Sequence, residues 1–232
     1  MAIILNLETA TETCSASLSE NGKLLAIKEN IDGQQHARLL TVFIDELFKE
    51  TGLSIKQLDA VAVSKGPGSY TGLRIGISAA KGIAYGADIP LIAVSTLQAL
   101  THGVLQNTNI VIEPESWLCP MIDARRMEVY TAFYDTKNQL KKDISAEIID
   151  EQSFQDILNV RKVLFFGNGA EKCKENIQSH NAIFIDHVIC SARDMIGLSY
   201  NAWHNKDFVD VAYFEPLYLK DFVATVPRNL LG

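Results

Sequence analysis

Hydrophobic and polar positions near the start of the chain alternate with the two-residue period of β-strands. Three strands are predicted in the first thirty residues, over 2–7, 14–18 and 24–29. Asn21-Gly22 is a typical hairpin turn between the second and the third of them. The chain therefore opens with a predicted β-meander that has a polar, hydroxyl-rich corner after its first strand.

The strongest helical pattern covers residues 34–50. Its apolar side chains are Ala37, Leu39, Leu40, Phe43, Ile44, Leu47 and Phe48. On a helical wheel they fill an arc of about 180°, whereas a helix with one buried side needs only about 100°. The extra width indicates either a helix that contacts its own sheet and something else, or a helix buried deeply inside one domain.

The rest of the chain alternates strands and helices, which is the pattern of α/β proteins. Further strands are predicted over 58–64, 91–94, 117–122, 128–134, 147–149, 163–166 and 182–186. Further helices are predicted over 73–86, 96–104, 153–158, 170–178 and 192–205. Because the polar stretch 106–114 lacks periodicity, we expect two domains, 1–105 and 106–232, with the last helix free to pack back on the first domain.

Small residues lie on almost every side of the predicted helix 73–86, although each interior glycine costs about 1 kcal/mol of helix propensity relative to alanine. One side of this helix carries Gly72, Gly76, Ala79, Ala80 and Ile83. That side would let another backbone approach closely. We interpret it as a close-packed helix–helix seam, either inside the molecule or between molecules.

Composition narrows the classes of function. The 232 residues are 47% hydrophobic and carry a net charge of −7, so a large core is expected and a surface devoted to nucleic acid is not. The four cysteines are scattered, which excludes a zinc ribbon, a ferredoxin site and a disulfide scaffold. No apolar run approaches the ~18 residues of a membrane span and no signal peptide is recognisable, so we expect a soluble, cytoplasmic protein.

Two loops are candidates for phosphate chemistry. Gly66–Gly72 joins a buried strand to a helix, where backbone N–H groups could hold an anion, but it matches neither a P-loop nor a dinucleotide fingerprint. Glu8 and Thr9 follow the first strand and could face a metal-bound phosphate. Both loops are also consistent with ordinary tight turns. His36 has Leu40 four residues on, so it forms no H-x-x-x-H zinc pair.

Several segments together resemble a known family. They cover 5–18, 36–40, 64–84 (SKGPGSYTGLRIGISAAKGIA), 90–100, 121–135 (MIDARRMEVYTAFYD) and 216–221 (PLYLKD). In order and spacing they are similar to TsaB, also called YeaZ, the family of bacterial tRNA threonylcarbamoyladenosine biosynthesis proteins. TsaD, a related family, carries a paired-histidine metal motif where this chain has only His36.

The resemblance implies an α/β ASKHA fold (that of acetate and sugar kinases, Hsp70 and actin), with two related subdomains that each hold a mixed sheet flanked by helices. It also implies a non-catalytic paralogue of TsaD. The expected partner is TsaD, the subunit that transfers threonylcarbamoyl to the adenosine beside the tRNA anticodon, with the ATPase TsaE as third member. A homodimer through the same helices is expected when the chain is alone, and tRNA is expected to be contacted only indirectly. No cofactor is expected beyond weak nucleotide binding.

Residue by residue, the resemblance places the partner interface on two helices. The residues it implies are His36, Leu39, Leu40, Phe43 and Leu47 from the first, and Leu73, Gly76, Ile77, Ala80 and Ala84 from the second. Glu8, Thr9, Gly66 and Gly68 match positions that face nucleotide phosphate in active ASKHA proteins, and no catalytic or metal-binding residue is expected. The alternatives are an M22-type metallopeptidase and an ASKHA phosphotransferase. For direct tRNA contact the only candidate cations are Arg125, Arg126, Lys220 and Arg228.

Overall fold

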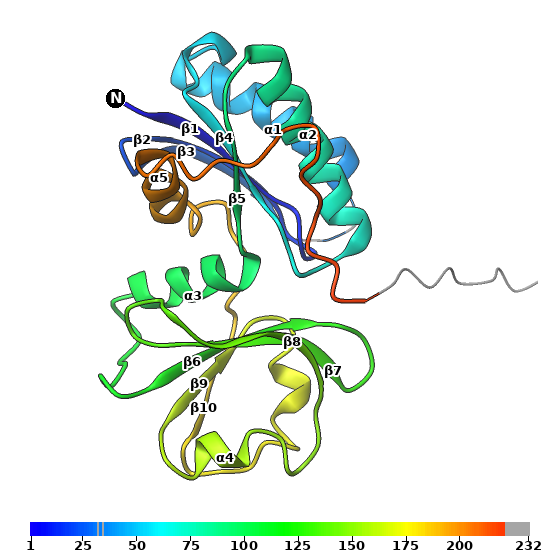
Figure 1. Ribbon diagram of the computed structural model, residues 1–232, viewed down its shortest axis with the longest axis vertical. Coiled ribbons are helices and arrows are strands. Elements are labelled where there is room, and N and C mark those ends of the chain that lie inside the picture. The colour runs from blue at the N-terminus through cyan, green and yellow to red at the C-terminus, as the bar shows by residue number, and fades with distance from the viewer. Residues whose placement is uncertain (32, 34, 221–232) are drawn as a thin grey trace, which may run out of the picture.

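Two five-stranded mixed sheets form the framework of the chain, whose computed structural model describes residues 1–31, 33 and 35–220 (Figure 1). The first sheet contains β1 (Ile3–Glu8), β2 (Cys14–Glu20), β3 (Lys23–Asn30), β4 (Ala60–Ser64) and β5 (Leu91–Val94), in the order β3-β2-β1-β4-β5. β1, β2 and β3 are antiparallel and joined by short turns. β1, β4 and β5 are parallel, so their connections need crossover helices.

The second sheet repeats this topology. It contains β6 (Trp117–Asp123), β7 (Glu128–Tyr134), β8 (Leu140–Ile148), β9 (Val163–Phe166) and β10 (Ala182–Ile185), in the order β10-β9-β6-β7-β8. Counted from its own first strand, each sheet has the order 3-2-1-4-5, with strands 1–3 antiparallel and strands 1, 4 and 5 parallel. The repeat confirms the predicted α/β fold of two related subdomains with mixed sheets.

Helices cover both faces of the first sheet. The helices of the described residues are α1 (His36–Thr51), α2 (Tyr70–Ala87), α3 (Thr96–Gln106), α4 (Gln155–Leu158) and α5 (Ile196–His204). Leu5 and Leu7 of β1 pack in the same cluster as residues of α1 and α2, whereas Ile4 packs on the other face with α5. Figure 1 shows α5 on the opposite side of the sheet from α1 and α2. Within residues 1–31, 33 and 35–220, no helix combines the length and the apolar composition that a membrane span needs.

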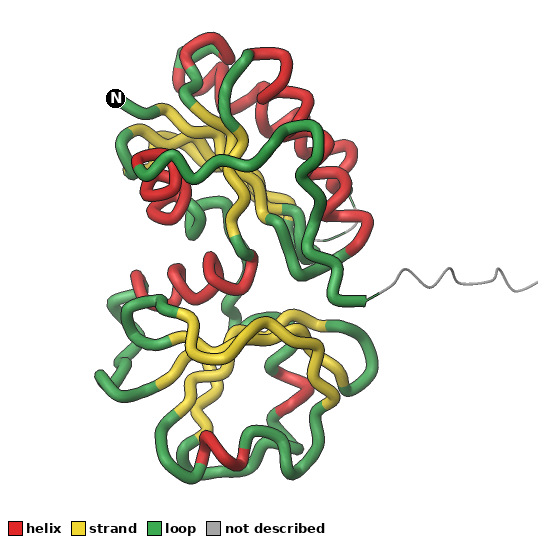
Figure 2. Tube along the Cα trace, in the orientation of Figure 1, coloured by secondary structure: helices red, strands yellow, loops and turns green. Residues whose placement is uncertain are grey.

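Two helices pack against the sheet that belongs to the other half of the chain. Leu97, Leu100 and Val104 of α3 pack into the core of the second sheet, and α3 lies between the two sheets in Figures 1 and 2. α5 packs on β1 and β5 of the first sheet. The division expected at 105/106 therefore differs from the packing, because the apolar stripe of α3 faces β6 and β7.

Two predicted elements differ from the structure. The helix expected over 170–178 is only a 3-10 turn, Glu171–Cys173, followed by further turns. Its buried Cys173 and Ile177 have helical spacing, which successive turns also satisfy. The strand expected over 147–149 is the end of the longer β8, whose outer half was hidden because an exposed edge strand is rich in charge.

Candidate functional site

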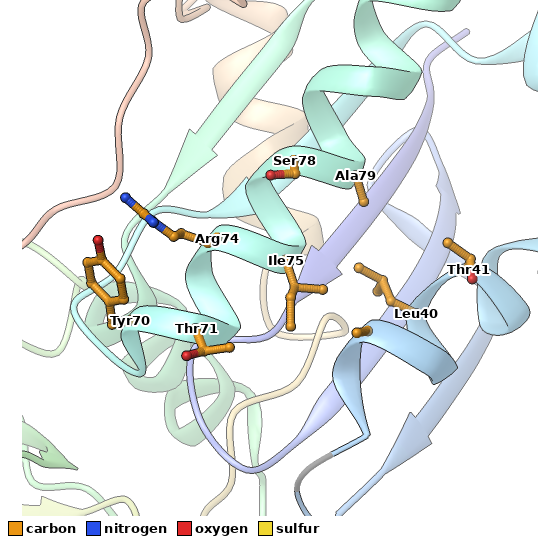
Figure 3. Close-up of a pocket in the computed structure, with 9 residues that line it drawn as sticks. Leu40, Thr41, Tyr70, Thr71, Arg74, Ile75, Ser78 and Ala79 are labelled. Carbon is orange, nitrogen blue, oxygen red and sulfur yellow. The ribbon is translucent and has the colours of Figure 1, made fainter. Parts of the chain in front are cut away.

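An open groove of about 520 Å³ lies between α1 and α2 (Figure 3). It is lined by Ala37, Leu40, Thr41, Tyr70, Thr71, Arg74, Ile75, Ser78 and Ala79. In Figure 3 Leu40 and Ile75 project into the space between the two helices. Arg74 is the one charged side chain in the lining. Among the described residues, the lining is therefore mainly apolar with one cationic side chain.

The wide apolar arc of α1 serves two contacts within the chain. Leu40, Ile44 and Leu47 are buried against the first sheet. Phe43 is half-buried, and Val42, at 44% exposure, remains on the surface. Because α1 also contacts α2, the sheet and α2 together account for most of the width of the arc. Contact of α1 with an external partner stays a prediction.

Most of the residues that the resemblance assigned to the partner interface lie inside the chain's own core. His36, Leu40, Leu47, Leu73, Gly76, Ile77, Ala80 and Ala84 are buried, and Leu39 and Phe43 are half-buried. The assignment to a partner interface stays a prediction, and in the chain alone most of its residues lie on the inner faces of the two helices. A partner could reach their exposed neighbours in the groove, chiefly Thr41, Arg74 and Ser78. Apolar periodicity alone does not tell a face against a sheet from a face against a partner.

The small-residue side of α2 is a close backbone approach, but to a loop. A Cβ on Gly72 would lie 2.1 Å from the carbonyl oxygen of Thr9, and a Cβ on Gly76 would lie 2.3 Å from Thr9 Oγ1. Thr9 Oγ1 donates a hydrogen bond of 2.8 Å to the Gly72 carbonyl. The close approach predicted from the glycines is present inside the molecule, but Gly72 and Gly76 pack against the β1–β2 loop and not against another helix.

The predicted phosphate corner is packed shut. Glu8 and Thr9 are fully buried, and a Cβ on Gly68 would lie 2.3 Å from the carbonyl oxygen of Ala10. Gly66, with φ +100, fits the tight-turn interpretation. Leu217 crosses this turn, with its N–H donating to the Lys65 carbonyl at 2.7 Å. The corner does bring its four expected residues together, but Glu8 points into the interior instead of a cleft.

Two buried carboxyl groups have strongly shifted acidity. Burial raises the pKa of Glu8 to about 7, although its carboxylate accepts a 2.6 Å hydrogen bond from the Ala10 N–H, which favours the charged form. Among the residues that the structure describes, none forms a hydrogen bond with Glu8 Oε2. Burial, with a contribution from Glu29, also raises the pKa of Asp194 to about 7. Both groups bear on stability more directly than on chemistry, because neither lines the groove.

His36 is a structural residue. Its Nε2 lies 2.7 Å from the Thr11 carbonyl, which ties the β1–β2 loop to the first turn of α1. Among residues 1–31, 33 and 35–220, no three His, Cys, Asp or Glu side chains gather closely enough to hold a metal ion. A zinc-peptidase centre is therefore not assembled within the described residues.

The C-terminal strap, residues 209–220, borders the groove and was hardly visible in the sequence pattern. Val209 pairs with Leu91 at the edge of the first sheet, and Lys81 Nζ donates to the Ala212 carbonyl at 3.1 Å. Tyr218 accepts a 3.3 Å hydrogen bond from Arg74 Nε, and its ring lies 4.9 Å from that of Tyr70. Tyr218 therefore orients the cationic anchor of the groove. The strap has no regular period, and the PLYLKD segment was its only signal.

The two mixed sheets with the same 3-2-1-4-5 strand order are the fold expected of an ASKHA-class protein. The family model of TsaD, described as tRNA N6-adenosine threonylcarbamoyltransferase, matches residues 28–227. The tRNA threonylcarbamoyladenosine biosynthesis protein TsaB of Escherichia coli K12 is 29% identical over 95% of this chain and 96% of its own length. TsaB of Haemophilus influenzae is 30% identical over 95% of this chain and 94% of its own length.

A solved structure supports the same assignment. An uncharacterized Pseudomonas aeruginosa protein with similarity to peptidase YeaZ superposes with a TM-score of 0.83 at 26% identity, covering 95% of this chain and 100% of its own. The chain belongs to the family that the TsaD model describes and, within it, to the TsaB proteins.

Proposed function

We propose that this chain is a non-catalytic subunit in tRNA threonylcarbamoyladenosine biosynthesis, which binds and activates TsaD and is joined by the ATPase TsaE. The observation that carries the proposal is the apolar groove between α1 and α2 with Arg74 as its single charge. Family membership supplies the partner's identity. The closed corner around Glu8 and Gly68 supports a subunit without its own phosphate chemistry.

Pairing through α1 and α2 suits a partner of the same fold. A related chain would present an equivalent helix pair, and two helix pairs laid together bury apolar grooves on both sides. The same geometry would let two copies of this chain pair when TsaD is absent. Because the chain has a net charge of −7, TsaD contributes most of the affinity of the complex for tRNA. The complex acts in the cytoplasm.

A charge placed in the groove tests this function. Ser78→Arg adds a bulky cation at an exposed position of the lining. We expect it to reduce TsaD recovered in co-purification at least tenfold, because an unpaired charge buried in an interface is strongly unfavourable. The matched control is Asn201→Arg, which adds the same charge to the exposed side of α5 on the opposite face of the sheet.

Size-exclusion chromatography of the same two variants tests self-association. The wild-type chain and Asn201→Arg should elute as dimers without TsaD, and Ser78→Arg as a monomer. Undiminished TsaD binding and tRNA modification by Ser78→Arg would contradict the proposal.

Nucleotide binding separates this proposal from an ASKHA phosphotransferase. Gly68 packs on Ala10 and Leu217 lies over Gly66, so other backbone already contacts both glycines of this loop. We therefore expect isothermal titration calorimetry to detect no binding of ATP or ADP to the isolated chain. A protein concentration of ~0.1 mM would reveal dissociation constants up to about that value. Stoichiometric heat from either nucleotide would favour the phosphotransferase.

A further inference from the structure

Two adjacent arginines adopt a left-handed backbone at the turn between β6 and β7. Arg125 has φ 70 and Arg126 has φ 47. Glycine, asparagine and aspartate are the usual residues at such angles. The β2–β3 turn of the same chain follows that preference, with Asn21 and Gly22 at φ 49 and 76. The arginine turn is therefore a departure from local turn chemistry, of the kind that accumulates at functional sites.

The surrounding structure holds this turn in place. Asp123 Oδ1 accepts a 2.9 Å hydrogen bond from the Arg125 N–H and forms an ion pair with Lys172. Lys172 Nζ also donates to the carbonyls of Arg126 and Glu128, at 2.6 and 2.8 Å. Lys172 thus bonds to residues both before and after the two arginines and holds the turn in its conformation. The two arginine side chains are presented by a preorganised backbone, which lowers the entropic cost of binding a ligand.

The charge around the turn is positive, although the chain as a whole is acidic. Arg125 and Arg126 are exposed, and within the described residues their guanidinium groups form no ion pair or hydrogen bond. The nearby carboxylates already have partners. These pairs are Asp123 with Lys172, Glu128 with Lys220, and Glu12 with Asn168 Nδ2. Lysines neutralise Asp123 and Glu128, whereas Glu12 is bonded to a neutral amide and keeps its charge. The two guanidinium groups outweigh that one carboxylate, so the charge of these groups together is positive.

We propose that the Arg125–Arg126 turn contacts the phosphate backbone of RNA, an inference that rests on the proposed function because it places the RNA in a complex with TsaD. Guanidinium forks bind phosphate oxygens in a bidentate geometry. The side chains that bond around the turn, those of Asp123, Glu128, Lys172 and Asn168, are charged or amide groups. An arginine anchor of a protein interface is set among buried apolar groups. The contact adds affinity without reading sequence.

The test measures the tRNA affinity of the complex with TsaD as NaCl is raised from 50 to 200 mM, using an unmodified tRNA transcript. The variant is Arg125→Gln with Arg126→Gln, and the charge-matched control is Lys56→Gln with Lys137→Gln, two exposed lysines away from the turn. We expect roughly tenfold weaker binding by the arginine variant at low salt. The slope of log K against log salt should fall by about 1.4–1.8, the value for two lost phosphate contacts.

Co-purification of each variant with TsaD reports the proposed function separately. Equal recovery of TsaD together with unchanged tRNA affinity and slope overturns the RNA contact. Loss of TsaD or TsaE from the arginine variant, with unchanged tRNA affinity, assigns the turn to an acidic protein surface and also overturns it. If even the wild-type chain fails to recover TsaD, the proposed function fails. Titration of the isolated chain with the same tRNA at ~20 mM NaCl then tests the turn alone, because low salt strengthens phosphate contacts. Loss of tRNA binding in the arginine variant supports the RNA contact, and equal binding by the variant and the wild type overturns it.

Discussion

Gly72→Ala is expected to destabilise the chain by about 3 kcal/mol, the upper end of what overpacking a core position costs. A Cβ at residue 72 would lie 2.1 Å from the carbonyl oxygen of Thr9. Relief would require a shift of backbone, because the atom in the way belongs to the β1–β2 loop and not to a mobile side chain. Urea denaturation followed by circular dichroism measures the change in unfolding free energy.

Gly82→Ala is the control on the same helix. Residue 82 is exposed, and no atom of the described part of the chain lies within 4 Å of a Cβ placed there. Alanine should therefore increase helix propensity and stabilise the chain by about 0.5–1 kcal/mol. Opposite signs for the two substitutions would separate the glycine required by the Thr9 contact from the glycine that is merely tolerated. Equal stability of Gly72→Ala and the wild type would show that the loop contact is loose.

Glu8→Gln is expected to stabilise the chain above neutral pH. The pKa of Glu8 rises from 4.5 to about 7 on folding, because burial disfavours the carboxylate. As pH rises from 4.5 to 7, the unfolded state loses its proton first, so unfolding becomes more favourable. The loss approaches about 3 kcal/mol at pH 8, at 1.36 kcal/mol per pKa unit. Glutamine keeps the oxygen that accepts from Ala10 and carries no charge.

Denaturation midpoints of the wild type and Glu8→Gln at pH 5 and pH 8 test this expectation. The two proteins should be similar at pH 5, and Glu8→Gln should be more stable at pH 8. Part of the decline should remain in the variant, because burial also raises the pKa of Asp194 to about 7. Glu115→Gln, at an exposed position, is the control and should change neither value. A less stable Glu8→Gln at pH 8 would mean that the native structure favours the charged Glu8.

The sequence predicted most of the fold because its central strands and long helices are strongly periodic. β4 and α1 were found with nearly correct bounds, since one is continuously apolar and the other amphipathic. The exposed half of β8 was missed because solvent-facing charges break the strand pattern. The position of α3 was not predictable from periodicity, which shows that a helix has an apolar face but not which sheet receives it, whereas α5 lies on the first domain, as the sequence analysis allowed.

The candidate site was predicted only in outline. The unusual composition of α1 and α2 did mark the helix pair that forms the groove. Which side of each helix faces the groove depends on how Gly72 and Gly76 seat against Thr9, a contact between segments far apart in the chain. Tyr218 was missed for the same reason: its hydrogen bond to Arg74 joins residues 144 apart, and no local pattern records it.

The return of α5 and Val209 to the first sheet has a consequence for the folding of the chain during its synthesis. The outer face of the first sheet, around Ile4 and Ile92, is covered by α5, and β5 pairs with Val209. When residue 94 leaves the ribosome, all five strands of this sheet exist, but more than a hundred further residues must be made before their cover arrives. At 5–20 residues per second that interval is roughly 5–20 s. During it the nascent chain exposes an apolar sheet face, which makes the first subdomain a natural client for chaperones that act at the ribosome.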